Sequence, residues 1–176
     1  MMKRHVALVG FMASGKSTIG RKLAHRLGWA FFDTDAIVVR AYGPIPAIFA
    51  NEGEAAFRRY ERAAIGDTLE SDEPRVVALG GGALTLAENR RVLGERAFQI
   101  FIKISPEQIL ARVRRSRETR PILGPNPTLA RIRQLYATRL AHYASSDRVI
   151  DAQRRNDREV IDEIVAWLRA QNALHA

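Results

Sequence analysis

The sequence predicts an α/β protein with a three-layer fold, in which helices flank a five-stranded parallel sheet. Short apolar runs that fit buried strands alternate along the chain with longer segments whose apolar residues recur at helical spacing. Glycines and prolines separate these segments at short intervals, as connecting loops require. The length of 176 residues and a hydrophobic fraction of 47% suit one compact domain with its own core.

The first half of the chain is predicted to supply three strands. The apolar run at 6–9 ends at Gly10, and the helix that follows stops at Gly28, because glycine readily terminates helices. Gly43, Pro44 and Pro46 divide the next helical stretch into short pieces. The expected order is strand 6–9, helix 16–27, strand 29–32, short helices 36–41 and 47–49, helix 53–69 and strand 75–79.

The second half is predicted to supply two strands and the remaining helices. Ser105 and Pro106 form a helix start, with a capping hydroxyl followed by proline in the first turn. Three prolines and Gly124 within twelve residues indicate a loop at 116–127. The expected order is helix 85–93, strand 98–104, helix 106–115, loop 116–127, a helix capped by Thr128 and ending near 144, strand 148–150 and helix 156–170.

Composition limits the classes of function. The chain has no cysteine, which excludes disulfides, thiolate nucleophiles and zinc-thiolate sites. No apolar stretch approaches about 18 residues, so we expect a cytoplasmic protein without membrane contact. The 28 Lys and Arg residues against 19 Asp and Glu give a net charge of +9. Only four of these cations are lysines, and the planar fork of arginine suits phosphates and carboxylates.

A phosphate-binding loop follows the first strand. Gly10-Phe-Met-Ala-Ser-Gly15-Lys16-Ser17 fits the pattern GxxxxGK[ST] and opens a helix, as that motif requires. Lys16 is expected to reach the β- and γ-phosphates of a nucleotide, and the Ser17 hydroxyl to ligate Mg²⁺. Backbone N–H groups of residues 13–17 can surround a phosphate at the positive end of the helix. The loop residues expected at the nucleotide are Ala13, Ser14, Gly15, Lys16, Ser17 and Thr18.

Two further groups lie at the ends of predicted strands, where ligands bind in open α/β sheets. Asp33 and Asp35 follow the second strand, and one can serve the metal while the other serves a hydroxyl. The alternative is that Asp35 only caps a helix. The run Gly80-Gly81-Gly82 follows the third strand and leaves its amides open to a ligand, although taken alone it is better explained by a tight turn.

Taken in order with the phosphate loop, several short motifs resemble the shikimate kinase family. They are Asp33-Thr34-Asp35, Phe57-Arg58-Arg59, Leu79-Gly80-Gly81-Gly82-Ala83, Arg120-Pro121, and Arg139 in Thr-Arg-Leu-Ala-His-Tyr. The resemblance covers essentially the whole chain, 1–176, as a single kinase domain. It implies a substrate-binding insertion at about 34–61 and a lid at about 116–127. It also implies transfer of the γ-phosphate of ATP to the 3-hydroxyl of shikimate, with Mg²⁺.

The resemblance assigns roles to individual residues. It implies that Asp35 and the glycines Gly80, Gly81 and Gly82 bind the shikimate hydroxyls. The shikimate carboxylate falls to Arg58 and Arg139, which matches the charge-assisted hydrogen bonds that guanidinium groups make. The catalytic set is Lys16, Asp35 and Arg120, with Asp33 reaching the metal through water. Arg115 and Arg155 (or its neighbour Arg154) are the family's candidates near adenine, whereas Arg112, Arg114 and Arg117 are expected to be solvated.

Two other functions stay open from the sequence. The first is a kinase of another small polyol acid, such as gluconate or an aminated shikimate. The second is a nucleic-acid-binding ATPase, suggested only by the charge of +9. The basic residues are scattered over several segments without a nucleic-acid-binding motif, so we expect no nucleic-acid partner. We expect a monomer that binds ATP and shikimate. Pro44 and Pro46 depart from the usual family pattern, and a helix shifted by them would alter substrate closure.

Overall fold

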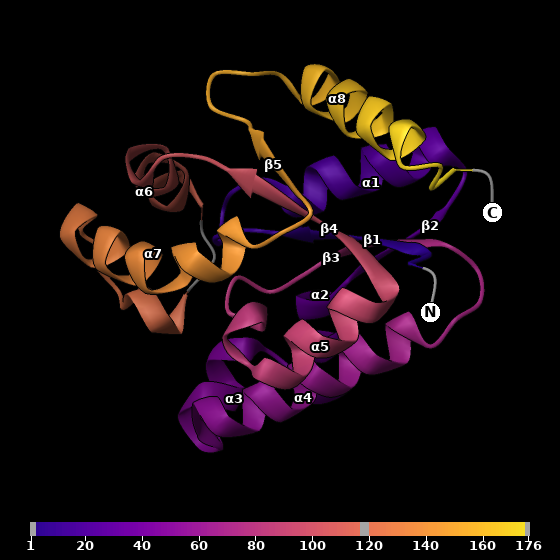
Figure 1. Cartoon of the computed structure of the whole chain (residues 1–176). Coiled ribbons are helices and arrows are strands. Elements are labelled where there is room, and N and C mark those ends of the chain that lie inside the picture. Colours follow the sequence, from indigo (N-terminus) through magenta and orange to yellow (C-terminus); the bar gives the residue numbers. More distant parts are fainter. Residues whose placement is uncertain (1–2, 117–119, 175–176) are drawn as a thin grey trace.

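A single parallel sheet organises the computed structural model, which describes residues 3–116 and 120–174. Its strand order is β2-β3-β1-β4-β5, and every neighbouring pair is parallel (Figure 1). The predicted five-stranded parallel sheet is therefore confirmed. The strands are β1 (His5–Val9), β2 (Ala30–Asp33), β3 (Arg75–Ala78), β4 (Ala97–Lys103) and β5 (Arg148–Asp151).

Helices cover both faces of the sheet. Helices α1 (Lys16–Leu27) and α8 (Asp157–Ala170) lie on one face, and α4 (Gly53–Leu69) and α5 (Ala87–Arg96) lie on the other (Figure 1). Helices α3 (Ile45–Asn51), α6 (Pro106–Arg115) and α7 (Leu129–Ala144) gather at the end toward which the strands run (Figure 1). The remaining elements are α2 (Thr34–Tyr42) and the 3₁₀ turns η1 (Ala83–Thr85) and η2 (Pro121–Leu123).

The central strand explains why this chain folds around a parallel sheet. All five residues of β1 are buried, because β3 and β4 flank it and helices cover both faces. A strand in that position is apolar throughout rather than alternating. A second, smaller core of Val38, Ile48, Phe57 and Ala64 joins α2, α3 and α4. This small core holds helices α2 to α4 together next to the ends of β2 and β3.

Several boundaries differ from those predicted. Strand β2 ends at Asp33 and α2 begins at Thr34, so the helix starts two residues earlier than expected. Helix α3 spans seven residues instead of three, because Pro46 lies in its first turn and suits that position. The predicted loop at 116–127 contains the turn η2, which starts at a proline whose fixed φ favours a helical turn. Residues 117–119 of that loop, including Arg117, lie outside the described residues.

No helix within residues 3–116 and 120–174 is long and apolar enough to cross a lipid bilayer.

Candidate active site

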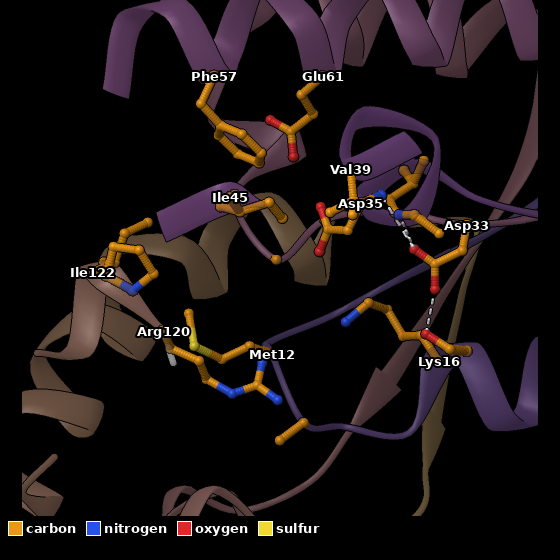
Figure 2. Close-up of a pocket in the computed structure, with 18 of the residues that line it drawn as sticks. Met12, Lys16, Asp33, Asp35, Val39, Ile45, Phe57, Glu61, Arg120 and Ile122 are labelled. Carbon is orange, nitrogen blue, oxygen red and sulfur yellow. Dashed lines mark hydrogen bonds between the residues drawn. The ribbon is translucent and has the colours of Figure 1, made fainter. Parts of the chain in front are cut away.

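A cavity of about 1080 Å³ opens at the carboxyl end of the sheet, beside the phosphate loop (Figure 2). It is lined by residues from the phosphate loop, α2, α3, α4, the glycine run after β3, α6, the segment around η2, and α7. Segments far apart in the chain therefore meet at one place. Most of the predicted site residues line it: Ala13, Gly15, Lys16, Ser17, Thr18, Asp33, Asp35, Arg58, Gly80, Gly81, Gly82, Arg120 and Arg139.

The phosphate loop holds Lys16 ready for a phosphate. Its ammonium group is buried and donates hydrogen bonds to the carbonyl oxygens of Gly10 (3.0 Å) and Phe11 (2.8 Å). Burial lowers the pKa of Lys16 to about 8, although the carboxylates of Asp35 and Asp33 oppose the shift. Ala13 has φ of 60°, a conformation that non-glycine residues rarely adopt and that is found at functional loops. Ser14, also predicted here, is 1% exposed and does not line the cavity.

Asp33 connects the loop with α2. Its Oδ1 accepts hydrogen bonds from the N–H groups of Asp35 (3.1 Å) and Ala36 (3.3 Å), so Asp33 is the N-cap of α2. The capping role that the sequence left open for Asp35 thus belongs to Asp33. The other oxygen, Oδ2, accepts a hydrogen bond of 2.5 Å from the Ser17 hydroxyl.

The side-chain oxygens of Ser17 and Asp33 are of the ligand type that a magnesium ion prefers. Both line the cavity next to Lys16, and Mg²⁺ prefers hard oxygen ligands supplied by one or two side chains together with substrate phosphates and water. No cluster of three or more His, Asp or Glu side chains that could hold a metal occurs within the described residues. A magnesium ion here would therefore depend on the nucleotide for most of its ligands.

Two buried carboxylates converge on Gly80. A Cβ atom added to Gly80 would lie 2.2 Å from Oε1 of Glu61 and 2.7 Å from Oδ1 of Asp35, so only glycine fits here. Those same two oxygens are buried and have no hydrogen-bond partner among the described residues. Burial raises the pKa of Asp35, with the neighbouring Asp33 adding to the shift. Two adjacent acceptors without donors in a cavity suit the hydroxyl groups of a ligand.

Arg58 is fixed in place by acidic residues on its own helix. Its guanidinium group donates to Glu61 (2.7 Å) and to Glu54 (2.9 Å), and its side chain is largely buried. A Cβ atom at Gly82 would lie 2.4 Å from Nη2 of Arg58, so the guanidinium group rests directly on the glycine backbone. Arg58 is thus held against the glycine run rather than extended into solvent.

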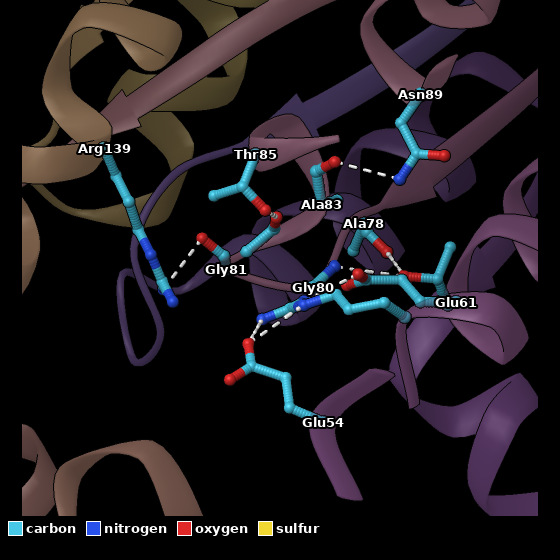
Figure 3. Close-up of polar contacts among 12 residues, drawn as sticks. Glu54, Glu61, Ala78, Gly80, Gly81, Ala83, Thr85, Asn89 and Arg139 are labelled. Atoms are coloured by element: carbon cyan, nitrogen blue, oxygen red, sulfur yellow. Dashed lines mark hydrogen bonds and ion pairs between the residues drawn. The ribbon is translucent and has the colours of Figure 1, made fainter. Parts of the chain in front are cut away.

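Arg139 reaches the same run from the opposite side. It comes from α7, is 4% exposed, and donates a hydrogen bond of 3.0 Å to the carbonyl of Gly81 (Figure 3). Its guanidinium carbon also lies 5.6 Å from the centre of the Phe11 ring, a cation–π arrangement. Two arginines from different helices therefore border three consecutive glycines, an arrangement able to bind a small carboxylate.

The arginines of α6 and of the C-terminal segment differ in whether they line the cavity. Arg112 is exposed, as expected, but it also lines the cavity and donates a hydrogen bond of 3.1 Å to the carbonyl of Ala13. Arg115 and Arg155 do not line the cavity. The Arg155 guanidinium donates instead to Glu163 at 2.6 Å. Arg120 does line the cavity, and Figure 2 shows it on the same side as Met12 of the phosphate loop.

Three residues near the site were not singled out from the sequence. Glu61 is 0% exposed although it lies in a highly charged helix. Thr34 is also buried, and its hydroxyl accepts a hydrogen bond of 3.0 Å from the N–H of Gly80. Tyr143 donates its hydroxyl to the Gly81 carbonyl. The sequence offered a signal for each of them. Glu61 follows Arg58 by three residues and Tyr143 follows Arg139 by four, spacings that place both members of each pair on one face of a helix. Thr34 lies within Asp-Thr-Asp.

The fold and the site together define a P-loop kinase that acts on a small acceptor molecule. The family profile described as "Shikimate kinase" matches residues 12–169. A shikimate kinase of Geobacter sulfurreducens is 41% identical over 94% of this chain and 91% of its own length. The chain belongs to the shikimate kinase family.

Solved structures agree with this membership. The "Shikimate kinase from Acinetobacter baumannii in complex with shikimate" superposes with a TM-score of 0.90 at 31% identity and covers 97% of this chain and 95% of that chain. A gluconokinase from Sinorhizobium meliloti superposes with a TM-score of 0.66 at 21% identity, over 97% of this chain and 95% of that chain. The gluconokinase likeness is to the fold alone. The comparisons favour the shikimate acceptor over gluconate.

Proposed function

We propose that the protein transfers the γ-phosphoryl group of ATP to the 3-hydroxyl of shikimate, giving ADP and shikimate 3-phosphate. The observation that carries the proposal is the convergence of two buried arginines and two buried, unpartnered carboxylate oxygens on the glycine run. Such a surface is complementary to a small molecule with one carboxylate and several hydroxyls. The solved Acinetobacter baumannii relative, described as a complex with shikimate, supports this acceptor.

The nucleotide side positions the phosphates. The backbone of the phosphate loop would cradle them, and Lys16 would exchange its bonds to the Gly10 and Phe11 carbonyls for bonds to phosphate oxygens. Arg120 lies in the predicted lid at about 116–127, and from there it would neutralise charge on the γ-phosphoryl group during transfer. Arg112 is placed better than Arg115 to contact the nucleotide, because its guanidinium group donates to the Ala13 carbonyl in the phosphate loop. Phosphoryl transfer depends mainly on such positioning and charge neutralisation.

The acceptor side orients the attacking hydroxyl. Arg58 and Arg139 would hold the shikimate carboxylate through charge-assisted hydrogen bonds. Asp35 would accept hydrogen bonds from the acceptor and take the proton of the attacking hydroxyl, because burial raises its pKa toward that of a useful base. Gly80, Gly81 and Gly82 let the acceptor approach the backbone closely. Glu61 would keep Arg58 aligned and present its second oxygen to an acceptor hydroxyl.

A magnesium ion would be held by two side chains of this protein. Ser17 would ligate the ion, and Asp33 would hold a water in its outer shell. When bound with ATP, the ion supplies further charge neutralisation at the phosphate oxygens. Asp33 also accepts the Ser17 hydroxyl hydrogen in this structure, which directs that hydrogen to Asp33 and leaves the lone pairs of the Ser17 oxygen available to the ion. We further propose that the enzyme works as a cytoplasmic monomer without a nucleic-acid partner.

Coupled ADP release tests the proposal. Purified protein with Mg-ATP is assayed with and without shikimate, and ³¹P NMR identifies the phosphorylated product. We expect shikimate to stimulate ADP release strongly, with one phosphate monoester formed for each ADP. No stimulation over ATP alone would overturn the proposed function.

A further inference from the structure

Tyr143 lies behind the acceptor side of the cavity, one helical turn beyond Arg139 on α7. Its side chain is 2% exposed, and it does not line the cavity. Its hydroxyl nevertheless donates to the carbonyl of Gly81, the same atom to which Arg139 donates at 3.0 Å. One carbonyl of the glycine run therefore has two donors, one neutral and buried, the other charged and facing the cavity.

The neutral donor is held firmly. The Tyr143 ring packs against Phe101, with ring centres 5.1 Å apart, and against Tyr136 at 6.4 Å. Burial raises the pKa of Tyr143 to about 12, so the hydroxyl keeps its proton throughout the physiological range. Tyr143 thus stays a donor whatever occupies the cavity.

The charged donor faces a competing acceptor. A carboxylate entering the cavity would attract the Arg139 guanidinium more strongly than a neutral carbonyl does, because the carboxylate carries a full negative charge and the carbonyl oxygen only a partial one. As Arg139 turns to the carboxylate, its bond to Gly81 weakens. Leaving a buried carbonyl without any hydrogen-bond donor costs free energy, and this cost would oppose the movement of Arg139. With Tyr143 in place, the Gly81 carbonyl keeps a donor.

We propose that Tyr143 is a positioning residue of the acceptor site. Its hydroxyl holds the Gly81 carbonyl, which releases the Arg139 guanidinium for the carboxylate of the acceptor and fixes the peptide that borders it. The inference rests on the proposed function, because it needs an acceptor that carries a carboxylate. Tyr143 itself touches neither substrate and acts only through Gly81 and Arg139.

Removal of the hydroxyl tests this role. Tyr143→Phe deletes one oxygen and keeps the ring packing, and the matched control is Tyr136→Phe, on the same helix and in the same aromatic group but without a hydrogen bond to Gly81. In Tyr143→Phe we expect KM for shikimate to rise about tenfold, the effect of one hydrogen bond, while KM for ATP and kcat change less than about twofold. The control should match the wild type in all three constants.

A double-variant cycle separates positioning from a structural role. The double variant Tyr143→Phe/Arg139→Met is compared with the single variant Arg139→Met. If Tyr143 acts through Arg139, Tyr143→Phe should raise KM for shikimate less than about twofold in that background, instead of tenfold. An undiminished factor in that background, an equal rise in KM for ATP, or unfolding of Tyr143→Phe at assay temperature would each overturn the inference. A wild type that is inactive with shikimate would overturn the proposed function and this inference together. An active wild type with an unchanged Tyr143→Phe would overturn the inference alone.

Discussion

The nucleotide side and the acceptor side of the cavity are built in different ways. The nucleotide side is formed mainly by one continuous segment, in which β1, the phosphate loop and the first turn of α1 follow one another along the chain. The acceptor side combines side chains at 33–35, 58–61 and 139–143 with the backbone of 80–82, and these segments meet only in the folded protein. Substitutions on the first side should therefore act locally, whereas those on the second should act through neighbouring residues.

The two sides also differ in how they are held. Lys16 binds backbone carbonyls of its own loop. On the acceptor side, bonds between side chains and distant backbone fix the glycine run: Thr34 contacts Gly80, and Arg139 contacts Gly81. This difference predicts that acceptor binding can be damaged without damage to nucleotide binding, and the reverse.

The largest effect is expected for Lys16→Met. Removing the ammonium group should lower kcat by about 10³-fold or more, because charge on the transferring phosphoryl group loses a fixed counter-ion. Shikimate binding measured by calorimetry should change less than about threefold. Lys22→Met is the matched control, since Lys22 lies in the same helix but pairs with Asp157 at the surface. Loss of shikimate binding in Lys16→Met would contradict the independence of the two sides.

Arg139→Lys tests the acceptor side in the same way. Lysine keeps the charge but loses the fork of donors, so we expect KM for shikimate to rise about 50-fold and KM for ATP to change less than about threefold. Arg133→Lys, on the same helix and paired with Glu107 at the surface, is the control. Equal losses for both substrates would indicate that Arg139 is structural.

Thr34→Val tests whether the glycine run depends on a distant hydroxyl. Valine has nearly the same shape, but it leaves the buried N–H of Gly80 without its acceptor. We expect a loss of about 1–3 kcal/mol in the free energy of unfolding and about a tenfold lower kcat/KM for shikimate. Thr34→Ser, which keeps the hydroxyl, should retain most of the free energy of unfolding and most of kcat/KM for shikimate. Unchanged stability and unchanged kcat/KM in Thr34→Val would contradict the dependence of the glycine run on this hydroxyl.

The pH profile should also separate the two sides. Because the pKa of Lys16 is lowered to about 8, the free enzyme carries the charged amine below pH 8 and loses it above. We therefore expect kcat/KM for ATP to fall above pH 8, approaching tenfold per pH unit. On the acidic side, the raised pKa of Asp35 should reduce kcat/KM for shikimate as that carboxylate is protonated. A flat profile for ATP between pH 7 and 9.5 would contradict the role of Lys16.

The smallest effects concern the outer arginines. Arg155→Ala should change KM for ATP less than about twofold, since its guanidinium group is bound to Glu163. Arg112→Ala should raise KM for ATP about fivefold, because that side chain contacts the phosphate loop. Initial-rate kinetics at saturating shikimate measures both. The reverse order would support the assignment that the resemblance implied for Arg155.

The difference between the two sides also explains what could be predicted from the sequence. The strand, glycine loop, lysine and helix of the nucleotide side are neighbours in the chain, so the motif carries the geometry with it. Arg58 and Arg139, taken singly, would have been ordinary helix residues, and only the ordered set of motifs indicated them. The order of the strands likewise cannot be obtained from the alternation of elements.

Other features depend on tertiary contacts that no local pattern encodes. Helix α6 ends with Arg112, Arg114 and Arg115, and the spacing of Ile109 and Val113 predicts which face is buried. It does not predict which neighbouring arginine faces the phosphate loop. Glu61 lies in a charged helix and would be expected at the surface, but it is buried because Arg58 pairs with it and Gly80 leaves room for it.

An acceptor panel is the sharpest test of whether the acceptor side is built for shikimate. With Mg-ATP held constant, kcat/KM is measured for shikimate, aminated shikimate and gluconate. We expect shikimate to be preferred over gluconate by about 10⁴-fold, because a site built to bind particular hydroxyls leaves its polar groups unpaired with an analogue that lacks them. Equal or greater kcat/KM for gluconate would contradict it.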